Sequence, residues 1–176
     1  DKYANTNPKN NEAQYTLLKS VTTNEGKQIN LYTNNKREVI FPSGVRKEIY
    51  NDGYQIVYFT NGDLKQIFPD SKSVYYFNEA KTVQTTFPDG LQVFKFNNGQ
   101  IEKHYPDGTK QISFPDGSLR YILNDGFEET HYADGTIQKI DKENVITLEH
   151  PDGLKEIKYP GGREECVYPD GEVREV

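Results

Sequence analysis

Glycines recur every nine residues along this chain, and this period constrains the fold more than any other feature of the sequence. Thirteen of the 14 glycines keep the register, in one set from Gly26 to Gly62 and another from Gly90 to Gly171. Gly161 lies outside it, and the register shifts by one residue between positions 71 and 90. A fixed internal period predicts an array of one repeated supersecondary unit.

Each period carries the residues of a tight β-turn. An aromatic residue stands three positions before most register positions. Four units read [Phe/Tyr]-Pro-Asp-Gly in full: 87–90, 105–108, 114–117 and 168–171. Proline presets φ at the first corner, aspartate accepts local backbone hydrogen bonds, and glycine adopts the left-handed conformation of a bulged three-residue hairpin loop. We therefore predict four structural turn glycines: Gly90, Gly108, Gly117 and Gly171.

The segments between the turns have the length of single β-strands. About six residues remain between turns, rich in Val, Ile, Thr, Tyr, Phe and Lys, which leaves no room for a helix. The fold class that follows is all-β, an extended open single-layer antiparallel β-meander of about fifteen strands. Residues 1–20 lack the turn signal and are predicted to be a flexible or irregular lead-in, whereas residues 21–176 are predicted to form one repeat β-sheet domain.

Neither face of the predicted sheet has the pattern of a dry core. Because the bulged loop swaps odd and even positions between neighbouring strands, Val57, Phe59, Tyr75, Phe94, Phe96, Glu102 and Ile112 are expected on one face. Ile56, Tyr58, Tyr76, Val93, Lys103 and Tyr121 are expected on the other. Each face mixes aromatic with charged residues, so we predict that both are solvent-exposed and that cross-strand ladders and the stems of Lys, Arg and Glu stabilise the sheet.

Composition and residue spacing argue against several functional classes. The net charge of −6 argues against nucleic-acid binding, which needs a basic face. Cys166 is the one cysteine, and His104, His131 and His150 are far apart, so there is no zinc signature. A phosphate loop and a Ser–His–acid grouping are also missing, and a flat sheet gives no cleft that would shift the pKa of a carboxyl group. We expect no catalytic residues, no metal, no cofactor, no membrane partner and no enzymatic activity.

The repeat resembles a known family. The tandem [Phe/Tyr]-Pro-Asp-Gly units, and the segment Gly-Gln-Ile-Glu-Lys-His-Tyr-Pro-Asp-Gly at 99–108, are similar to the T-complex-protein-10-type C-terminal domain. This domain is also called the G-box and is found in centriole-assembly scaffolds of the CPAP (centromere protein J) type, a microcephaly-related family. The resemblance covers about residues 26–176. It implies a non-catalytic scaffold module of centriole duplication, in the cytoplasm at the centrosome or centriole, that docks a proline-rich, Arg-containing segment of a STIL-type protein.

The resemblance also implies a peptide-binding site on one face of the sheet. The matching positions are Phe59, Tyr75 and Phe96, with Glu102 accepting a hydrogen bond from an arginine of the peptide. Phe94 and Tyr58 are further candidates, although Tyr58 is expected on the opposite face. A polyproline segment is already extended, so its ordering costs little on binding to exposed rings. Taken singly, each of these aromatic residues could equally be a cross-strand ladder residue, and Glu102 a solvated charge.

Two other functional classes remain open from the sequence. The open ends of the sheet present unpaired backbone groups, so the domain could self-associate end to end. Nonapeptide arrays also occur in surface and fibre repeats, which would predict bound Ca²⁺ or many more near-identical repeats. The missing Gly-Gly-x-Gly-x-Asp pattern counts against that third class.

Overall fold

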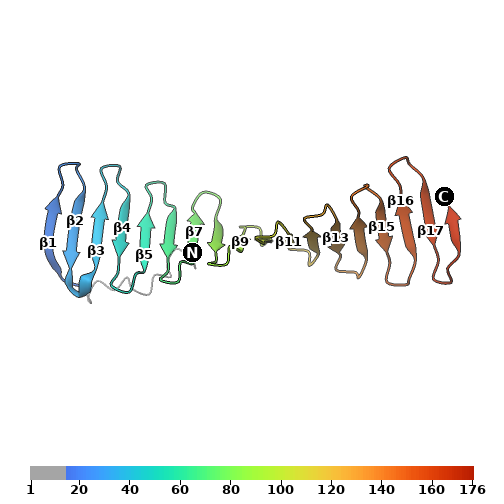
Figure 1. The fold of residues 1–176 in the computed structure, drawn as a ribbon, viewed down its shortest axis with the longest axis horizontal. Coiled ribbons are helices and arrows are strands. Elements are labelled where there is room, and N and C mark those ends of the chain that lie inside the picture. The colour runs from blue at the N-terminus through green and yellow to red at the C-terminus, as the bar shows by residue number, and fades with distance from the viewer. Residues whose placement is uncertain (1–14) are drawn as a thin grey trace. The chain divides into compact units, whose positions relative to one another are not determined.

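The computed structural model describes residues 15–176, which form two compact units that divide between residues 97 and 98. The described part holds eighteen β-strands and one short 3₁₀ helix, η2 (Thr33–Asn35). Figure 1 shows the strands in chain order. The first fourteen residues of the predicted lead-in lie outside the described residues. We describe the two units separately.

The first unit is a meander of nine strands: β1 (Leu17–Thr22), β2 (Gln28–Tyr32), β3 (Arg37–Ile40), β4 (Arg46–Ile49), β5 (Gln55–Tyr58), β6 (Leu64–Ile67), β7 (Ser73–Phe77), β8 (Thr82–Thr86) and β9 (Gln92–Lys95). Each strand pairs antiparallel with its neighbour in sequence.

The second unit repeats this plan with nine more: β10 (Ile101–His104), β11 (Lys110–Ser113), β12 (Leu119–Ile122), β13 (Glu128–His131), β14 (Ile137–Ile140), β15 (Ile146–Glu149), β16 (Lys155–Lys158), β17 (Glu164–Val167) and β18 (Val173–Glu175). Its neighbouring strands are also antiparallel. The predicted fold class, an open all-β antiparallel meander, is confirmed for the described residues of each unit.

The structure has more strands than the sequence predicted. The strand β1 begins at Leu17, inside the predicted lead-in and before the first glycine of the repeat. Several turns are also made without glycine, because Ser71 and Asn144 adopt φ of 72° and 63°. Asparagine and serine tolerate this left-handed region at a cost, so they complete the turn at register positions that lack glycine.

The repeated turns have the geometry that their residue pattern predicts. Gly90, Gly108, Gly117 and Gly171 have φ between 89° and 94°. In the turn at Gly90, its N–H donates to the carbonyl of Phe87 (2.9 Å), and the N–H of Phe87 donates to the carbonyl of Leu91 (2.8 Å). The carboxylate of Asp89 accepts from the N–H of Leu91 (3.0 Å). The aromatic residue, the aspartate and the glycine of the motif thus each form a hydrogen bond that closes the turn, which explains why the pattern recurs.

The turn between β7 and β8 differs from the others. It spans 78–81 and holds the extra residue that shifts the register of the repeat, with Lys81 at φ 51°. Both flanking strands have five residues, and Tyr75 pairs with Gln84 across them. The pairing continues on both sides without a break, so the extra residue is confined to the turn.

Strand register defines the two faces of the first unit. Face A carries the row Val57, Lys65, Tyr75, Gln84 and Phe94, which pair from strand to strand. Face B carries the row Asn30, Glu38, Glu48, Ile56, Gln66 and Val74. These assignments agree with the alternation that the sequence predicts.

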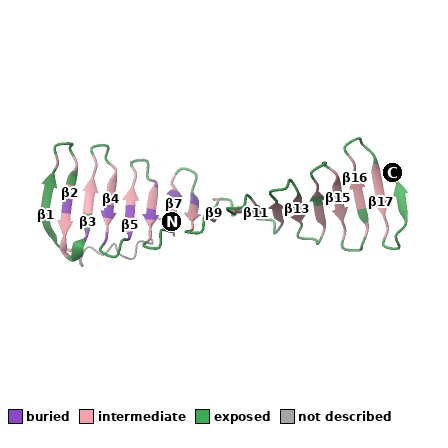
Figure 2. Ribbon diagram, viewed as in Figure 1, coloured by how far each residue is buried: buried purple, intermediate pink, exposed green. Residues whose placement is uncertain are grey.

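Burial in the first unit is concentrated on face B, a difference between the two faces that the sequence did not predict. Ile56 is 1% exposed and packs with the rings of Tyr50 and Tyr54. The polar residues Glu48 and Gln66 of the same row are buried too. The aromatic rings of Tyr15, Tyr58 and Phe68 pack against this cluster and cover the row. Figure 2 shows the buried positions in β2 and in β4 to β8, whereas most of residues 98–176 are intermediate or exposed.

Candidate functional site

Face A of the first unit carries a cluster of three aromatic rings. The ring centroids of Phe59 and Tyr75 are 5.7 Å apart, and those of Tyr75 and Phe77 are 4.4 Å apart. Phe59 directly follows β5, and the other two belong to β7. All three are half-buried, so each ring packs against a neighbour and still presents one side to solvent. We call these residues the Tyr75 cluster.

A second pair of aromatic rings lies on the same face. Phe94 and Phe96 stack with centroids 6.3 Å apart and planes 14° apart. Phe94 shares a cross-strand row with Tyr75 through Gln84, so the polar Gln84 lies between the pair and the Tyr75 cluster. Face A therefore offers two aromatic surfaces that share a row and are separated by an amide side chain.

The carboxylate of Asp63 holds Tyr75 in place. The hydroxyl of Tyr75 donates to Oδ2 of Asp63 (2.7 Å), and the backbone N–H of Asn78 donates to Oδ1 (2.8 Å). The hydrogen bond to the carboxylate raises the pKa of Tyr75 to about 12, and the same bond lowers the pKa of Asp63. Because its proton is committed to Asp63, the phenolic oxygen of Tyr75 can only accept a hydrogen bond from a ligand.

Asp63 was not singled out from the sequence, although it is 8% exposed and contacts a candidate site residue. It stands directly after the turn glycine Gly62, a position that holds an apolar or hydroxyl residue in most repeats, such as Leu91, Thr109 and Ser118. The carboxylate at this position was the sequence feature that could have drawn attention to Asp63.

Tyr58 is placed apart from the other candidates. Its side chain lies on face B, in a row with Leu64 and Tyr76. The guanidinium carbon of Arg46 lies 4.0 Å from the centroid of its ring. This cation–π contact occupies the ring, so the structure does not bring Tyr58 together with Phe59 and Tyr75.

Glu102 belongs to the second unit. It lies on β10, pairs with Ile112 and is half-buried. Its Oε1 is 3.5 Å from Nε2 of His104, and its Oε2 accepts from the side-chain amide of Gln100 (3.3 Å). We call the side of the second unit that carries Glu102, Ile112 and Arg120 the Glu102 face.

The described residues show neither metal-binding nor membrane-spanning features. Within residues 15–176, no group of three or more His, Cys, Asp or Glu side chains is arranged to hold a metal ion. None of the helical segments in this part is long and apolar enough to cross a membrane.

Together, the open antiparallel repeat and its aromatic face define a class, a single-layer β-sheet domain with a surface suited to docking. The family model of the T-complex protein 10 C-terminus matches residues 88–122. The TCP10 domain of Danio rerio CPAP, solved in complex with a peptide of Danio rerio STIL, is 38% identical, with 86% of this chain and 93% of that chain covered and a TM-score of 0.69. This chain belongs to the T-complex protein 10 C-terminal domain family, as its resemblance predicted.

Two further structures extend the comparison. The G-box domain of the microcephaly protein CPAP, described with a suggested role in centriole elongation, is 40% identical over 80% of this chain and 97% of that chain, with a TM-score of 0.66. The TCP domain of Drosophila melanogaster SAS-4, in complex with a proline-rich motif of Ana2, is 23% identical over 92% and 96%, with a TM-score of 0.58, and shares the fold. A comparison with curated protein sequences gave no match.

Proposed function

We propose that this domain is a scaffold module of centriole assembly that docks a peptide of a STIL-type partner on face A. The Tyr75 cluster is the observation that carries this proposal, because its rings are fixed by one another and by Asp63 yet open to solvent. The domain of Danio rerio CPAP, 38% identical to this chain, was solved with a STIL peptide. The same function predicts action at the centriole or centrosome in the cytoplasm.

The chemistry of face A suits a proline-rich peptide. A polyproline II segment has no internal backbone hydrogen bonds and is extended before it binds, so little conformational entropy is lost. Its pyrrolidine rings pack on flat aromatic surfaces such as those of Phe59, Tyr75 and Phe96. A backbone N–H or a guanidinium of the peptide can donate to the phenolic oxygen of Tyr75, whose own proton is held by Asp63.

Glu102 is the proposed acceptor for an arginine of the peptide. Its carboxylate is half-buried and its existing partners are a histidine and a neutral amide. A guanidinium would form a charge-assisted hydrogen bond with it. We further propose that the domain has no catalytic activity, because docking a peptide requires only a surface of complementary shape.

A peptide titration tests the docking proposal. A labelled proline-rich, Arg-containing peptide should bind the domain saturably, and Phe59→Ala should weaken binding about tenfold or more, because aromatic anchors dominate such interfaces. The matched control is Tyr58→Ala, the next residue of the chain on face B, which should leave affinity unchanged. Equal losses in both variants, with folding verified by circular dichroism, would place the site elsewhere.

A second peptide isolates the role of Glu102. Glu102→Gln should weaken binding of the Arg-containing peptide. It should not change the affinity for a peptide with Gln in place of Arg. Loss of affinity for both peptides would instead indicate a structural role for Glu102.

End-to-end self-association is a second candidate function, favoured by the terminal strands. In the described residues, β1 pairs with β2 alone and β18 with β17 alone. The side chain of Leu18 on β1 is 67% exposed, and that of Val173 on β18 is 57% exposed. Exposed apolar edge strands are sites where another chain can add a strand.

A further inference from the structure

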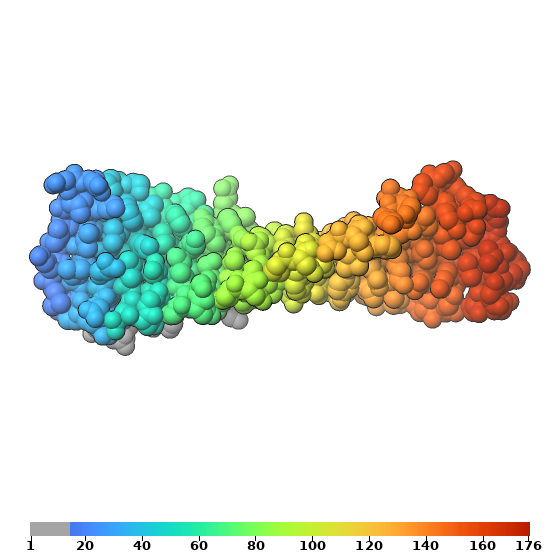
Figure 3. Space-filling view, in the orientation of Figure 1, coloured from blue at the N-terminus to red at the C-terminus, as the bar shows by residue number. Residues whose placement is uncertain are grey.

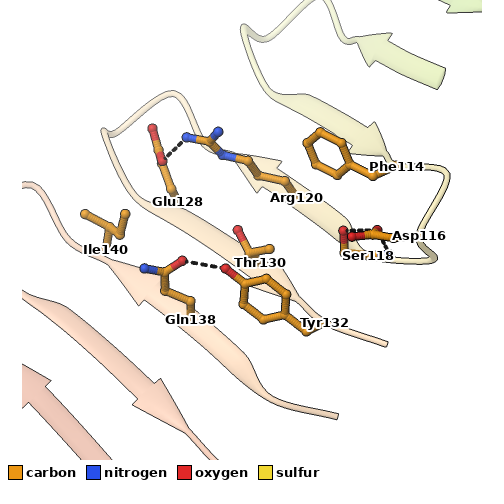
Figure 4. Close-up of a pocket in the computed structure, with 9 residues that line it drawn as sticks. All are labelled: Phe114, Asp116, Ser118, Arg120, Glu128, Thr130, Tyr132, Gln138 and Ile140. Atoms are coloured by element: carbon orange, nitrogen blue, oxygen red, sulfur yellow. Dashed lines mark hydrogen bonds and ion pairs between the residues drawn. The ribbon is translucent and has the colours of Figure 1, made fainter. Parts of the chain in front are cut away.

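The Glu102 face of the second unit contains a groove that the docking site on face A does not use. It has a volume of about 340 Å³ and lies over β12 to β14 (Figure 4). Its walls are aromatic and aliphatic at the rim and polar in the middle. The lining residues that matter for the argument are Phe114, Arg120, Glu128, Tyr132, Gln138 and Ile140.

The polar side chains of the groove are held by one another. The hydroxyl of Tyr132 donates to Oε1 of Gln138 (3.0 Å), and Arg120 pairs with Glu128 through a short N–O contact. Figure 4 shows these two pairs on either side of the groove. Because the side chains are fixed before a ligand arrives, less conformational entropy is lost on binding.

Gln138 supplies the groove with a hydrogen-bond donor. Its amide oxygen is engaged by Tyr132, and its amide nitrogen points away from that ring, towards Ile140 (Figure 4). Within residues 15–176, no hydrogen bond is formed by this nitrogen. A primary amide in this state can donate to a carbonyl oxygen, and the carbonyls of a polyproline II segment are all without internal partners.

The spacing of the two aromatic rims matches the repeat of a polyproline II helix. Phe114 directly follows β11 and Tyr132 directly follows β13. These two strands run in the same direction, so both residues lie at the same end of the strands, two strands apart. Strands are about 4.8 Å apart, which puts these backbone positions roughly 9.6 Å from each other. Three residues of polyproline II rise about 9.3 Å, so every third residue of such a segment meets a ring.

We propose that this groove is a second docking site, for a polyproline II segment that runs across β11 to β14 with proline at every third position. The ligand class rests on the proposed function, whereas the location and the spacing come from the second unit alone. Prolines would pack on Phe114 and Tyr132, and a carbonyl of the peptide beyond Tyr132, over β14, would accept from the amide of Gln138. The Arg120–Glu128 pair leaves the groove without a large excess charge, as suits a largely apolar peptide.

The test is an NMR titration of the whole 176-residue chain, carried in the Phe59→Ala background to weaken the face A site. The probes are two nonapeptides of the same composition, one with proline at positions 1, 4 and 7 and the other with proline at positions 1, 3 and 5. We expect the side-chain amide signals of Gln138 to shift saturably with the first peptide and several-fold more weakly with the second. Absence of a Gln138 shift in the folded protein would overturn the proposal.

Variants on one strand provide the matched control. Gln138→Ala should weaken binding of the first peptide about fivefold, as expected for one hydrogen bond. Lys139→Ala, on the opposite face of the same strand, should leave binding unchanged. Equal effects of the two variants would contradict binding of the peptide in the groove.

The same titration on the wild-type chain separates this proposal from the docking site on face A. Shifts at Tyr75 without shifts at Gln138 would support face A and overturn the groove. Shifts at Gln138 without shifts at Tyr75 would support the groove and contradict docking on face A.

Discussion

At the residue scale, Asp63 gives Tyr75 properties that the other candidate rings lack. Its carboxylate accepts from the phenol of Tyr75 and from the backbone of Asn78, so one acid fixes both a ring and a turn. The sequence identified Tyr75 through its family resemblance and through the alternation of faces. The signal at Asp63, a carboxylate directly after a turn glycine, does not by itself show which side chain it contacts, and its partner lies twelve residues away on a neighbouring strand.

Replacing Asp63 with asparagine should change the acid dependence of stability. The pKa of Asp63 is lowered in the folded state, so its ionised form adds stability that is present above the unfolded pKa of about 3.9 and is lost as pH falls. Asp63→Asn should therefore lower the free energy of unfolding at pH 7 more than at pH 3. Urea denaturation at both pH values measures this, and equal losses would show that the carboxylate charge does not contribute.

The same variant should change the ionisation of Tyr75. Its pKa of about 12 reflects the bond to the Asp63 carboxylate, so Asp63→Asn should bring the pKa back towards 10. For a raised pKa, the stabilisation is present below about pH 10 and is lost as pH rises through the folded value. Ultraviolet titration of tyrosinate absorbance, with Tyr75→Phe to assign the signal, checks the shift.

Turn glycines should differ in their tolerance of alanine. Both Gly62 and Gly171 have φ near 90°, which costs an L-residue about 1–2 kcal/mol. At Gly62 an added Cβ would also lie 2.6 Å from the side-chain nitrogen of Asn78, which donates to the carbonyl of Asn61, whereas at Gly171 it meets nothing within 4 Å. Thermal unfolding should show Gly62→Ala to be the more destabilising. Equal melting temperatures would mean that Asn78 moves aside freely.

At the element scale, face B shows what a binary pattern can and cannot predict. The row through Glu48, Ile56 and Gln66 mixes polar with apolar residues, which predicts a solvent-exposed face. All three residues are nevertheless buried. Glu48 is satisfied by the hydroxyl of Tyr50 (2.5 Å), by Arg46 and by the ammonium of Lys36 (3.9 Å). The sequence predicted the register and the faces, because both follow from local turns. It could not predict which face is covered, because that depends on where long side chains lie.

Neighbouring residues of β5 should therefore respond differently to truncation. Ile56→Ala removes a fully buried side chain and should cost about 2–4 kcal/mol of unfolding free energy. Val57→Ala, on face A and half-buried, should cost markedly less. Chemical denaturation of both variants measures the difference, and similar costs would show that the two faces are equally packed.

At the scale of the whole molecule, the repeat made the fold class predictable from sequence. Each hairpin closes through a local turn, and the turn signal recurs with one period along the chain. The sequence predicted fewer strands than the structure contains, because β1 has no glycine turn before it. The division into two compact units was not predicted either, since the repeat pattern runs across residues 97 and 98 without a change of period.

End-to-end association should depend on the exposed edge of β1. Leu18→Lys places a charge on this edge and should reduce any concentration-dependent increase in sedimentation coefficient. Leu123→Lys, at an exposed turn position, is the matched control and should have no effect. Unchanged sedimentation of the wild-type chain over a wide concentration range would exclude this mode of association.

The one-residue insertion at 78–81 has a consequence for folding. A chain of near-identical hairpins can pair in alignments displaced by whole repeats, and many of these preserve the turns. A hairpin with two five-residue strands and a four-residue loop between its last paired residues, Phe77 and Thr82, has no equivalent elsewhere in the described chain. The bond from Asn78 to Asp63 ties it to the turn between β5 and β6. The irregular hairpin is therefore matched only in the native alignment of the strands, so alignments displaced by whole repeats are higher in energy.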